Sequence, residues 1–180
     1  MLFRSYSNDG KIIFEGEYLN NQRYKGKEYN SYGDIIFEGQ YKYDERYNGK
    51  GYNNCSQFNY INGKIDGNIV VYDFIKHELF EGEYKNGEKY NGVLKTYFDE
   101  ISYMLKREVH IKEGNISEEG KEYYGNGKLK YKGEFQNGVY NGKGTLYYKY
   151  SGYINYVGDF KNGEKNGIGK EFDKLGNLIH

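Results

Sequence analysis

Histidine and cysteine, the side chains that most often carry nucleophilic or metal chemistry, are few and scattered in this sequence. The histidines are His77, His110 and His180, and no two of them have the spacing of a metal-binding pair. Cys55 is the single cysteine, which excludes a disulfide framework and a cysteine-rich zinc site, and no basic residue lies beside it to activate its thiol. We therefore expect no catalytic residue, no metal ligand and no cofactor, and a protein that is not an enzyme.

Carboxylates, by contrast, recur at regular intervals. Such a row on one face of a sheet could bind calcium ions. It could also be a solvated face whose carboxylates pair with lysines on neighbouring strands, and we prefer this second interpretation. The carboxylates are Glu15, Glu17, Glu38, Glu81, Glu83, Glu134 and Asp159, and the lysines are Lys27, Lys50, Lys121, Lys143 and Lys170.

The charge balance limits the partners. The chain has 180 residues with 26 basic and 26 acidic side chains, so its net charge is zero. Nucleic-acid binding needs a large cationic excess, so we expect no nucleic-acid partner. The longest aliphatic run is Ile69-Val70-Val71, too short to cross a membrane, and the residues after Met1 lead us to expect no signal peptide. With one cysteine, we expect a reducing, cytoplasmic location and leave a peripheral location at a membrane open.

A repeated motif indicates the elements that position these side chains. Its pattern is an aromatic residue, any residue, glycine, any residue and an aromatic residue, at an average spacing of about 24 residues. Two further copies, centred on Phe58 and Arg107, lack the glycine. We predict one array over residues 1–180 of about seven repeats, with incomplete first and last repeats and an irregular junction near residues 51–60. The clear copies are Phe14–Tyr18, Phe37–Tyr41, Phe80–Tyr84, Tyr131–Phe135 and Tyr156–Phe160.

The sequence pattern predicts that each repeat forms two short antiparallel strands. Apolar and polar residues alternate around each motif, as in a strand with one buried face. The central glycine leaves space for an aromatic ring of a neighbouring repeat, and Asn-Gly pairs such as Asn137-Gly138 predict hairpin turns. The absence of alanine speaks against helices. The predicted fold is all-β, an elongated single-layer antiparallel sheet of tandem β-hairpin repeats with 14–15 strands.

The motif, the Asn-Gly pairs and the Gly-x-Gly segments together resemble the MORN repeat, and they are also similar to the variant repeats of bacterial YwqK-type antitoxin proteins. The resemblance extends over residues 3–180, although tyrosine or phenylalanine stands where many MORN repeats have tryptophan. It implies a single-layer β-rod that serves in scaffolding, dimerisation or membrane association.

Two surfaces are candidates for binding. A single sheet has no second layer to cover its row of rings, so part of that row is expected to be an accessible interaction surface. Lys128, Lys130 and Lys132 alternate with other residues, so we predict that they share a face. We prefer to interpret this face as solvated, and keep the three lysines as a candidate patch for an acidic partner. The favoured function is a protein-interaction scaffold that binds itself or a partner; the alternatives are association with anionic phospholipids and an antitoxin or immunity function. The rings are Phe14, Tyr18, Phe37, Tyr41, Phe80, Tyr84, Tyr131, Phe135, Tyr156 and Phe160.

Overall fold

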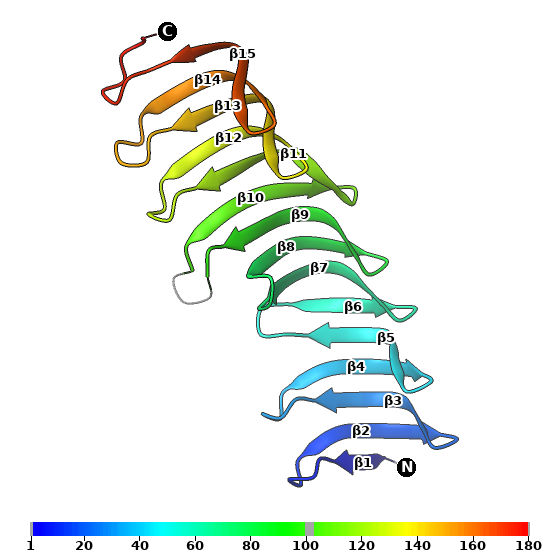
Figure 1. The fold of residues 1–180 in the computed structure, drawn as a ribbon. Coiled ribbons are helices and arrows are strands. Elements are labelled where there is room, and N and C mark those ends of the chain that lie inside the picture. Colours follow the sequence, from blue (N-terminus) through cyan, green and yellow to red (C-terminus); the bar gives the residue numbers. More distant parts are fainter. Residues whose placement is uncertain (1, 100–102, 180) are drawn as a thin grey trace. The chain divides into compact units, whose positions relative to one another are not determined.

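The computed structural model describes residues 2–99 and 103–179, and within these ranges it contains strands and no helix. Fifteen strands form one open antiparallel sheet in which the spatial order follows the chain from β1 to β15 (Figure 1). The predicted sheet of consecutive hairpins is thereby confirmed. The strands are β1 Phe3–Tyr6, β2 Ile12–Leu19, β3 Gln22–Tyr29, β4 Ile35–Lys42, β5 Glu45–Tyr52, β6 Gln57–Ile61, β7 Lys64–Asp73, β8 Glu78–Lys85, β9 Glu88–Tyr97, β10 Leu105–Lys112, β11 Asn115–Tyr123, β12 Leu129–Gln136, β13 Val139–Tyr147, β14 Ile154–Lys161 and β15 Glu164–Glu171.

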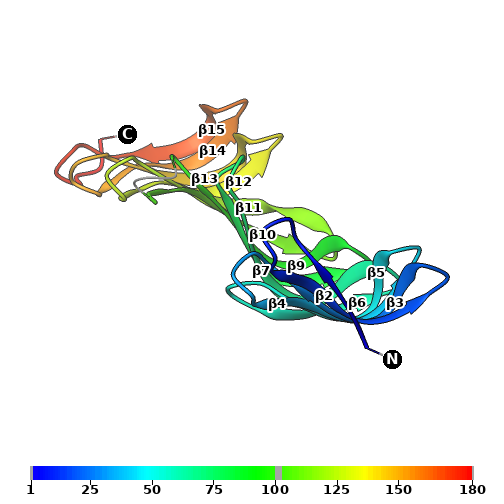
Figure 2. The same cartoon turned by 90° about the horizontal axis from the view of Figure 1, so that it is seen from below.

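The chain divides into two compact units. Unit 1 comprises Met1–Val71 and Glu81–Tyr90, and unit 2 comprises Tyr72–Phe80 and Asn91–His180. Within each unit the described strands form a single layer with no further element stacked on it (Figure 2). Each unit has its own cluster of buried rings, so each must stabilise its sheet through contacts between side chains of that one layer.

The turns inside the repeats have a uniform geometry. Both residues of each two-residue turn have positive φ, which is the type I′ conformation that matches the twist of a hairpin. Asparagine and glycine adopt this conformation most easily, which explains four of the Asn-Gly pairs. The turns are Asn20-Asn21, Tyr43-Asp44, Asn62-Gly63, Asn86-Gly87, Glu113-Gly114, Asn137-Gly138 and Asn162-Gly163.

Four further Asn-Gly pairs lie inside strands, contrary to their prediction as turns, and they begin at Asn48, Asn91, Asn141 and Asn166. Two of these asparagines bind the turn of the following hairpin. The side-chain oxygen of Asn48 accepts the backbone N–H of Asn62 at 2.8 Å, and that of Asn91 accepts the N–H of Glu113 at 3.0 Å. Asn48 and Asn91 therefore connect one repeat to the next.

A row of glycines crosses the middle of each unit because the strands approach closely there. A Cβ atom on Gly39 would lie 2.6 Å from the Cα of Gly49 and 2.8 Å from the ring of Phe37. Phe37 belongs to the same strand as Gly39, so the prediction that a neighbouring repeat's ring covers the glycine is wrong. The opposed glycine pairs are Gly16 with Gly26, Gly26 with Gly39, Gly39 with Gly49, Gly120 with Gly133, Gly133 with Gly144, Gly144 with Gly158, and Gly158 with Gly169.

The rings of the motif pack edge to face beside these glycines. In unit 1 the Phe14 ring lies 5.4 Å from that of Tyr18 in its own strand and 5.3 Å from that of Tyr41 in the next hairpin. In unit 2 the Tyr131 ring makes the same contacts with Phe135 and Phe160, both at 5.1 Å. The ring of one hairpin thus fills the space beside the next, and this interlocking forms the core.

The junction near residues 51–60 is short and has its own hydrogen bonds. The side-chain oxygen of Asn53 accepts the N–H groups of Cys55 and Ser56 and the Ser56 hydroxyl. The following strand, β6, has five residues, and it pairs with β5 without the register shift seen in most other pairs. The shortening of the repeat at this junction therefore affects both the connection and strand β6.

Candidate functional site

The face opposite the rings carries a ladder of charges. In unit 1 the residues directly opposite one another on successive strands are Arg4, Glu15, Lys27, Glu38 and Lys50, so the sign alternates at every step. Arg4 pairs with Glu15 at 2.6 Å and Lys27 with Glu38 at 3.6 Å. Opposite charges on neighbouring strands stabilise a sheet, so four of the five charges in this row pair with one another, and Lys50 at its end lies opposite Glu38.

The alternation stops in unit 2. Glu108 on β10 is opposite Lys121 on β11, but Lys121 is opposite Lys132 on β12, and the row continues with Thr145 and Val157. Lys132 stands where the corresponding strands of unit 1 have Glu15 and Glu38. One step of the ladder therefore sets two ammonium groups opposite each other, with no carboxylate after them in the row.

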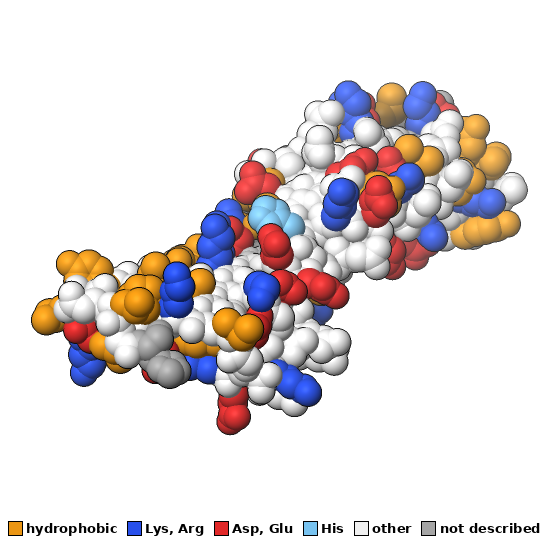
Figure 3. Space-filling view, turned by 90° about the horizontal axis from the view of Figure 1, so that it is seen from above, with side chains coloured by type: hydrophobic (Ala, Val, Ile, Leu, Met, Phe, Trp, Pro, Cys, Tyr) orange, Lys and Arg blue, Asp and Glu red, His pale blue; other side chains and the backbone are white. Residues whose placement is uncertain are grey.

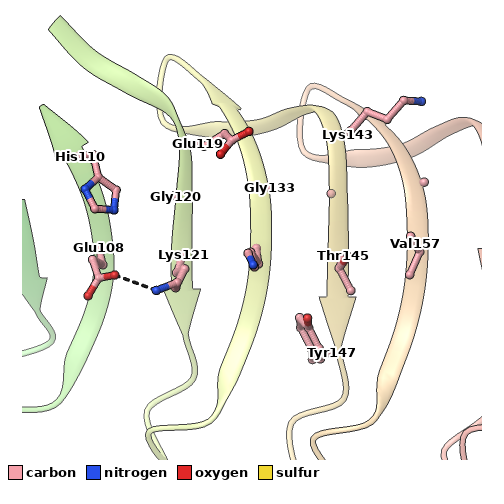
Figure 4. Close-up of a pocket in the computed structure, with 13 residues that line it drawn as sticks. Glu108, His110, Glu119, Gly120, Lys121, Gly133, Lys143, Thr145, Tyr147 and Val157 are labelled. Atoms are coloured by element: carbon pink, nitrogen blue, oxygen red, sulfur yellow. Dashed lines mark hydrogen bonds and ion pairs between the residues drawn. The ribbon is translucent and has the colours of Figure 1, made fainter. Parts of the chain in front are cut away.

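A groove of about 500 Å³ lies over this break (Figure 4). The backbone of four glycines forms the centre of the groove, because glycine has no side chain on either face of the sheet. They are Gly120, Gly133, Gly144 and Gly158. Figure 4 shows Glu108 and Lys121 joined on one side of Gly120, with His110 and Glu119 on the other side. The lining residues are Glu108, His110, Glu119, Gly120, Lys121, Lys132, Gly133, Lys143, Gly144, Thr145, Tyr147, Val157 and Gly158.

Two of the three groove lysines are paired and the third is not. Lys121 lies 2.9 Å from Glu108, and Lys143 lies 2.5 Å from Asp159. The hydrogen bonds and negative charges of these carboxylates raise the pKa of Lys121 and of Lys143. Among the described residues, Lys132 has neither an ion-pair nor a hydrogen-bond partner.

The preferred interpretation of the recurring carboxylates is confirmed where these pairs form, with Lys27, Lys121 and Lys143 each bound to a carboxylate on a neighbouring strand. Acidic and basic side chains are interspersed over the surface shown in Figure 3, without a large area of one sign. Within residues 2–99 and 103–179, no three His, Cys, Asp or Glu side chains come together in an arrangement that could hold a metal ion.

Lys128, Lys130 and Lys132 do not share a face, contrary to the prediction. The register between β11 and β12 shifts beside Lys130, and this β-bulge turns its side chain toward the rings. Lys130 donates to Glu122 at 2.7 Å and lies 5.7 Å from the centre of the Tyr140 ring. Lys128 contacts the backbone oxygen of Tyr150 in the next connection. Of the three, Lys132 alone lines the groove.

The row of rings is mostly the core and not an accessible surface. Tyr18 and Tyr84 are half-buried. Side chains of the second strand in a hairpin cover the others: Arg23 lies 4.9 Å above the Phe14 ring, and Tyr140 stacks on Tyr131 at 3.8 Å. Long side chains can thus cover one sheet without a second layer. The buried members are Phe14, Phe37, Tyr41, Phe80, Tyr131, Phe135, Tyr156 and Phe160.

The covering side chains form an ion-pair network in unit 1. Arg46 lies 5.6 Å from the centre of the Phe37 ring, and it donates to Glu28 at 2.9 Å and to the Tyr60 hydroxyl at 3.2 Å. Burial alone would raise the pKa of Glu28, but the hydrogen bond from Arg46 and the charges of Arg46 and Arg23 outweigh it, so the pKa is lowered. This network borders a second hollow, of about 730 Å³.

The structure does not bring Cys55, His77 and His110 together. Cys55 is exposed. His77 is in the connection before β8, where its Nδ1 atom is buried and has no hydrogen-bond partner among the described residues, and His110 lies at the edge of the groove. His180 lies outside the described residues.

The sequence was compared with protein-family models and with curated proteins, and it matches none of them significantly. No helix among the described residues has the length and hydrophobicity needed to cross a bilayer.

Proposed function

We propose that the chain is a non-catalytic, MORN-like repeat protein that acts as an interaction scaffold and receives a protein partner in the groove of unit 2. The observation that carries this proposal is the broken charge ladder. The unit 1 row alternates in sign and pairs Arg4 with Glu15 and Lys27 with Glu38, whereas the unit 2 row sets Lys132 opposite Lys121 and, among the described residues, leaves it without a partner in a groove of about 500 Å³. An ammonium group without a partner inside the protein can pair with a carboxylate of a binding partner, which supports the proposal.

The location of this surface differs from the one that the sequence favoured. The rings are used to stabilise the sheet, so the binding surface is assigned to the polar face. The partner can be a second copy of this chain or another protein, and an immunity function would be one form of the same activity. The single exposed cysteine suits a reducing cytoplasm, where we place the protein.

A photoreactive side chain in the groove tests the proposal. We expect Thr145→benzoylphenylalanine, irradiated in source cells, to yield discrete protein adducts that mass spectrometry can identify. Lys27→benzoylphenylalanine is the matched control, since Lys27 has the corresponding ladder position in unit 1. Adducts of equal yield at both positions, or no adduct at position 145, would contradict a partner in the groove.

Vesicle flotation tests the phospholipid alternative. We expect little binding to vesicles that contain anionic lipid at physiological salt, because Lys128 and Lys130 both have partners within the protein. Strong flotation that is lost in Lys132→Gln would favour the lipid alternative over a protein partner.

A further inference from the structure

Two pairs of like charges lie side by side on the polar face of β11 and β12. Lys121 is opposite Lys132, and Glu119 is opposite Glu134. The opposed glycines Gly120 and Gly133 separate the two pairs. Like charges directly opposite each other destabilise a sheet, so this arrangement is unfavourable in the free protein.

One member of each pair is already engaged by a neighbour. Lys121 is bound to Glu108 at 2.9 Å, and the carboxylate of Glu134 accepts the backbone N–H of Lys143 at 3.0 Å. Among the described residues, neither Lys132 nor Glu119 has a side-chain hydrogen-bond or ion-pair partner. One free ammonium and one free carboxylate therefore line the same groove.

The spacing of these two groups suits an extended chain. Glu119 is directly opposite Glu134, which lies two residues after Lys132 on β12. The side chains of Glu119 and Lys132 are therefore two residue positions apart along the strand direction. Alternate side chains of an extended peptide point to the same side and are about 7 Å apart. The groove volume of about 500 Å³ is within the range of sites that bind small ligands or a few residues of a peptide.

We propose that the groove binds an extended peptide segment that carries a carboxylate and an ammonium group two residues apart, as in Glu-x-Lys. The carboxylate pairs with Lys132 and the ammonium with Glu119, while the glycine backbone between them admits the peptide closely. This inference rests on the proposed function and narrows the partner to a segment of mixed charge.

The test uses a fluorescein-labelled peptide, Thr-Thr-Glu-Thr-Lys-Thr-Thr, and fluorescence anisotropy with the full chain. We expect saturable binding, and at least tenfold weaker binding of otherwise identical peptides that contain Glu-Thr-Glu or Lys-Thr-Lys. If no peptide binds at millimolar concentration, or if all three bind equally, the inference is overturned. A Thr145 adduct would then still support the proposed function, so the two failures can be told apart.

Lys132→Glu separates a binding role from a structural one. It places a carboxylate opposite Lys121 and restores the alternation seen in unit 1, so we expect an equal or higher thermal midpoint together with at least tenfold weaker peptide binding. The matched control is Lys27→Glu, which sets like charges opposite Glu15 and Glu38 and should lower the midpoint but leave peptide binding intact. Retained binding in Lys132→Glu would overturn the inference.

Discussion

The arginines that cover the rings have different partners in the first and second repeats. Arg46 has Glu28 as its partner on the preceding hairpin. Arg23 covers Phe14 in the same way, but the residue opposite Phe14 on β1 is Ser5, whose buried hydroxyl has no hydrogen-bond partner in the described part of the chain. The guanidinium of Arg23 has no hydrogen-bond or ion-pair partner among the described residues. The first repeat therefore lacks the carboxylate that the second one has.

Ser5→Glu should supply this carboxylate. We expect the free energy of unfolding to rise by up to about 1 kcal/mol, the usual upper range for a partly exposed ion pair. Urea denaturation at neutral pH and low salt measures the change. Ser5→Gln has nearly the same size without the charge, and an equal gain in that variant would show that packing, and not the pairing with Arg23, is responsible.

Glu28→Gln should destabilise unit 1 by about 1–3 kcal/mol at pH 7, because it weakens the hydrogen bond of Arg46 and leaves a half-buried cation without its counter-charge. The pKa of Glu28 is lowered from its ordinary value of 4.5, so its contribution is complete above pH 4.5 and is lost as the pH falls below that value. Denaturation at pH 7 and pH 3 should show the difference between the two proteins shrinking at pH 3. A difference that is independent of pH would refute the assignment to the ionised carboxylate.

At the scale of the strand, the opposed glycines set how closely neighbouring strands approach. A Cβ atom on Gly133 would lie 2.4 Å from the backbone oxygen of Lys143 and 2.5 Å from the Cα of Gly144. Neither backbone can move without shifting a whole strand, so the glycine is required by the pairing as well as by the ring beside it.

Gly133→Ala should therefore lower the free energy of unfolding by about 1–3 kcal/mol, the typical cost of overpacking. Gly125→Ala is the control, since a Cβ on Gly125 meets no atom within 4 Å and its φ does not require glycine. Thermal unfolding of the two variants provides the comparison. Equal stability in both would mean that the sheet relaxes around the new methyl group.

For the molecule as a whole, the division into two compact units predicts uneven stability. Each unit has its own cluster of rings, and contacts in a repeat array are made mainly between adjacent elements. Truncating a ring should therefore act first on the unit that contains it.

Phe135→Ala removes a buried ring from unit 2 and should cost about 3–5 kcal/mol there. Native-state hydrogen exchange should show faster exchange at the amides of β12–β15, while those of β2–β5 in unit 1 keep most of their protection. Equal acceleration of exchange in both units would indicate that the chain unfolds as one cooperative body.

The repeat period, the strands and four of the turns could be predicted from the sequence because they depend on local chemistry. Alternation along a strand and the preference of Asn-Gly for positive φ act over a few residues, and they place both Phe14 and Asn137 correctly. The same local pattern marked Asn48-Gly49 as a turn, although the pair lies inside β5.

The candidate site depends on the tertiary structure, because it arises from the register between neighbouring strands, which local sequence patterns do not determine. Strict alternation put Lys130 on the face of Lys132, but the bulge between β11 and β12 turned it toward the rings. Likewise, the exposure of the rings depended on side chains such as Arg23, which reach over them from another strand. The register between β11 and β12 also places Lys121 opposite Lys132, since a shift of one residue would move one of the two lysines to the other face of the sheet.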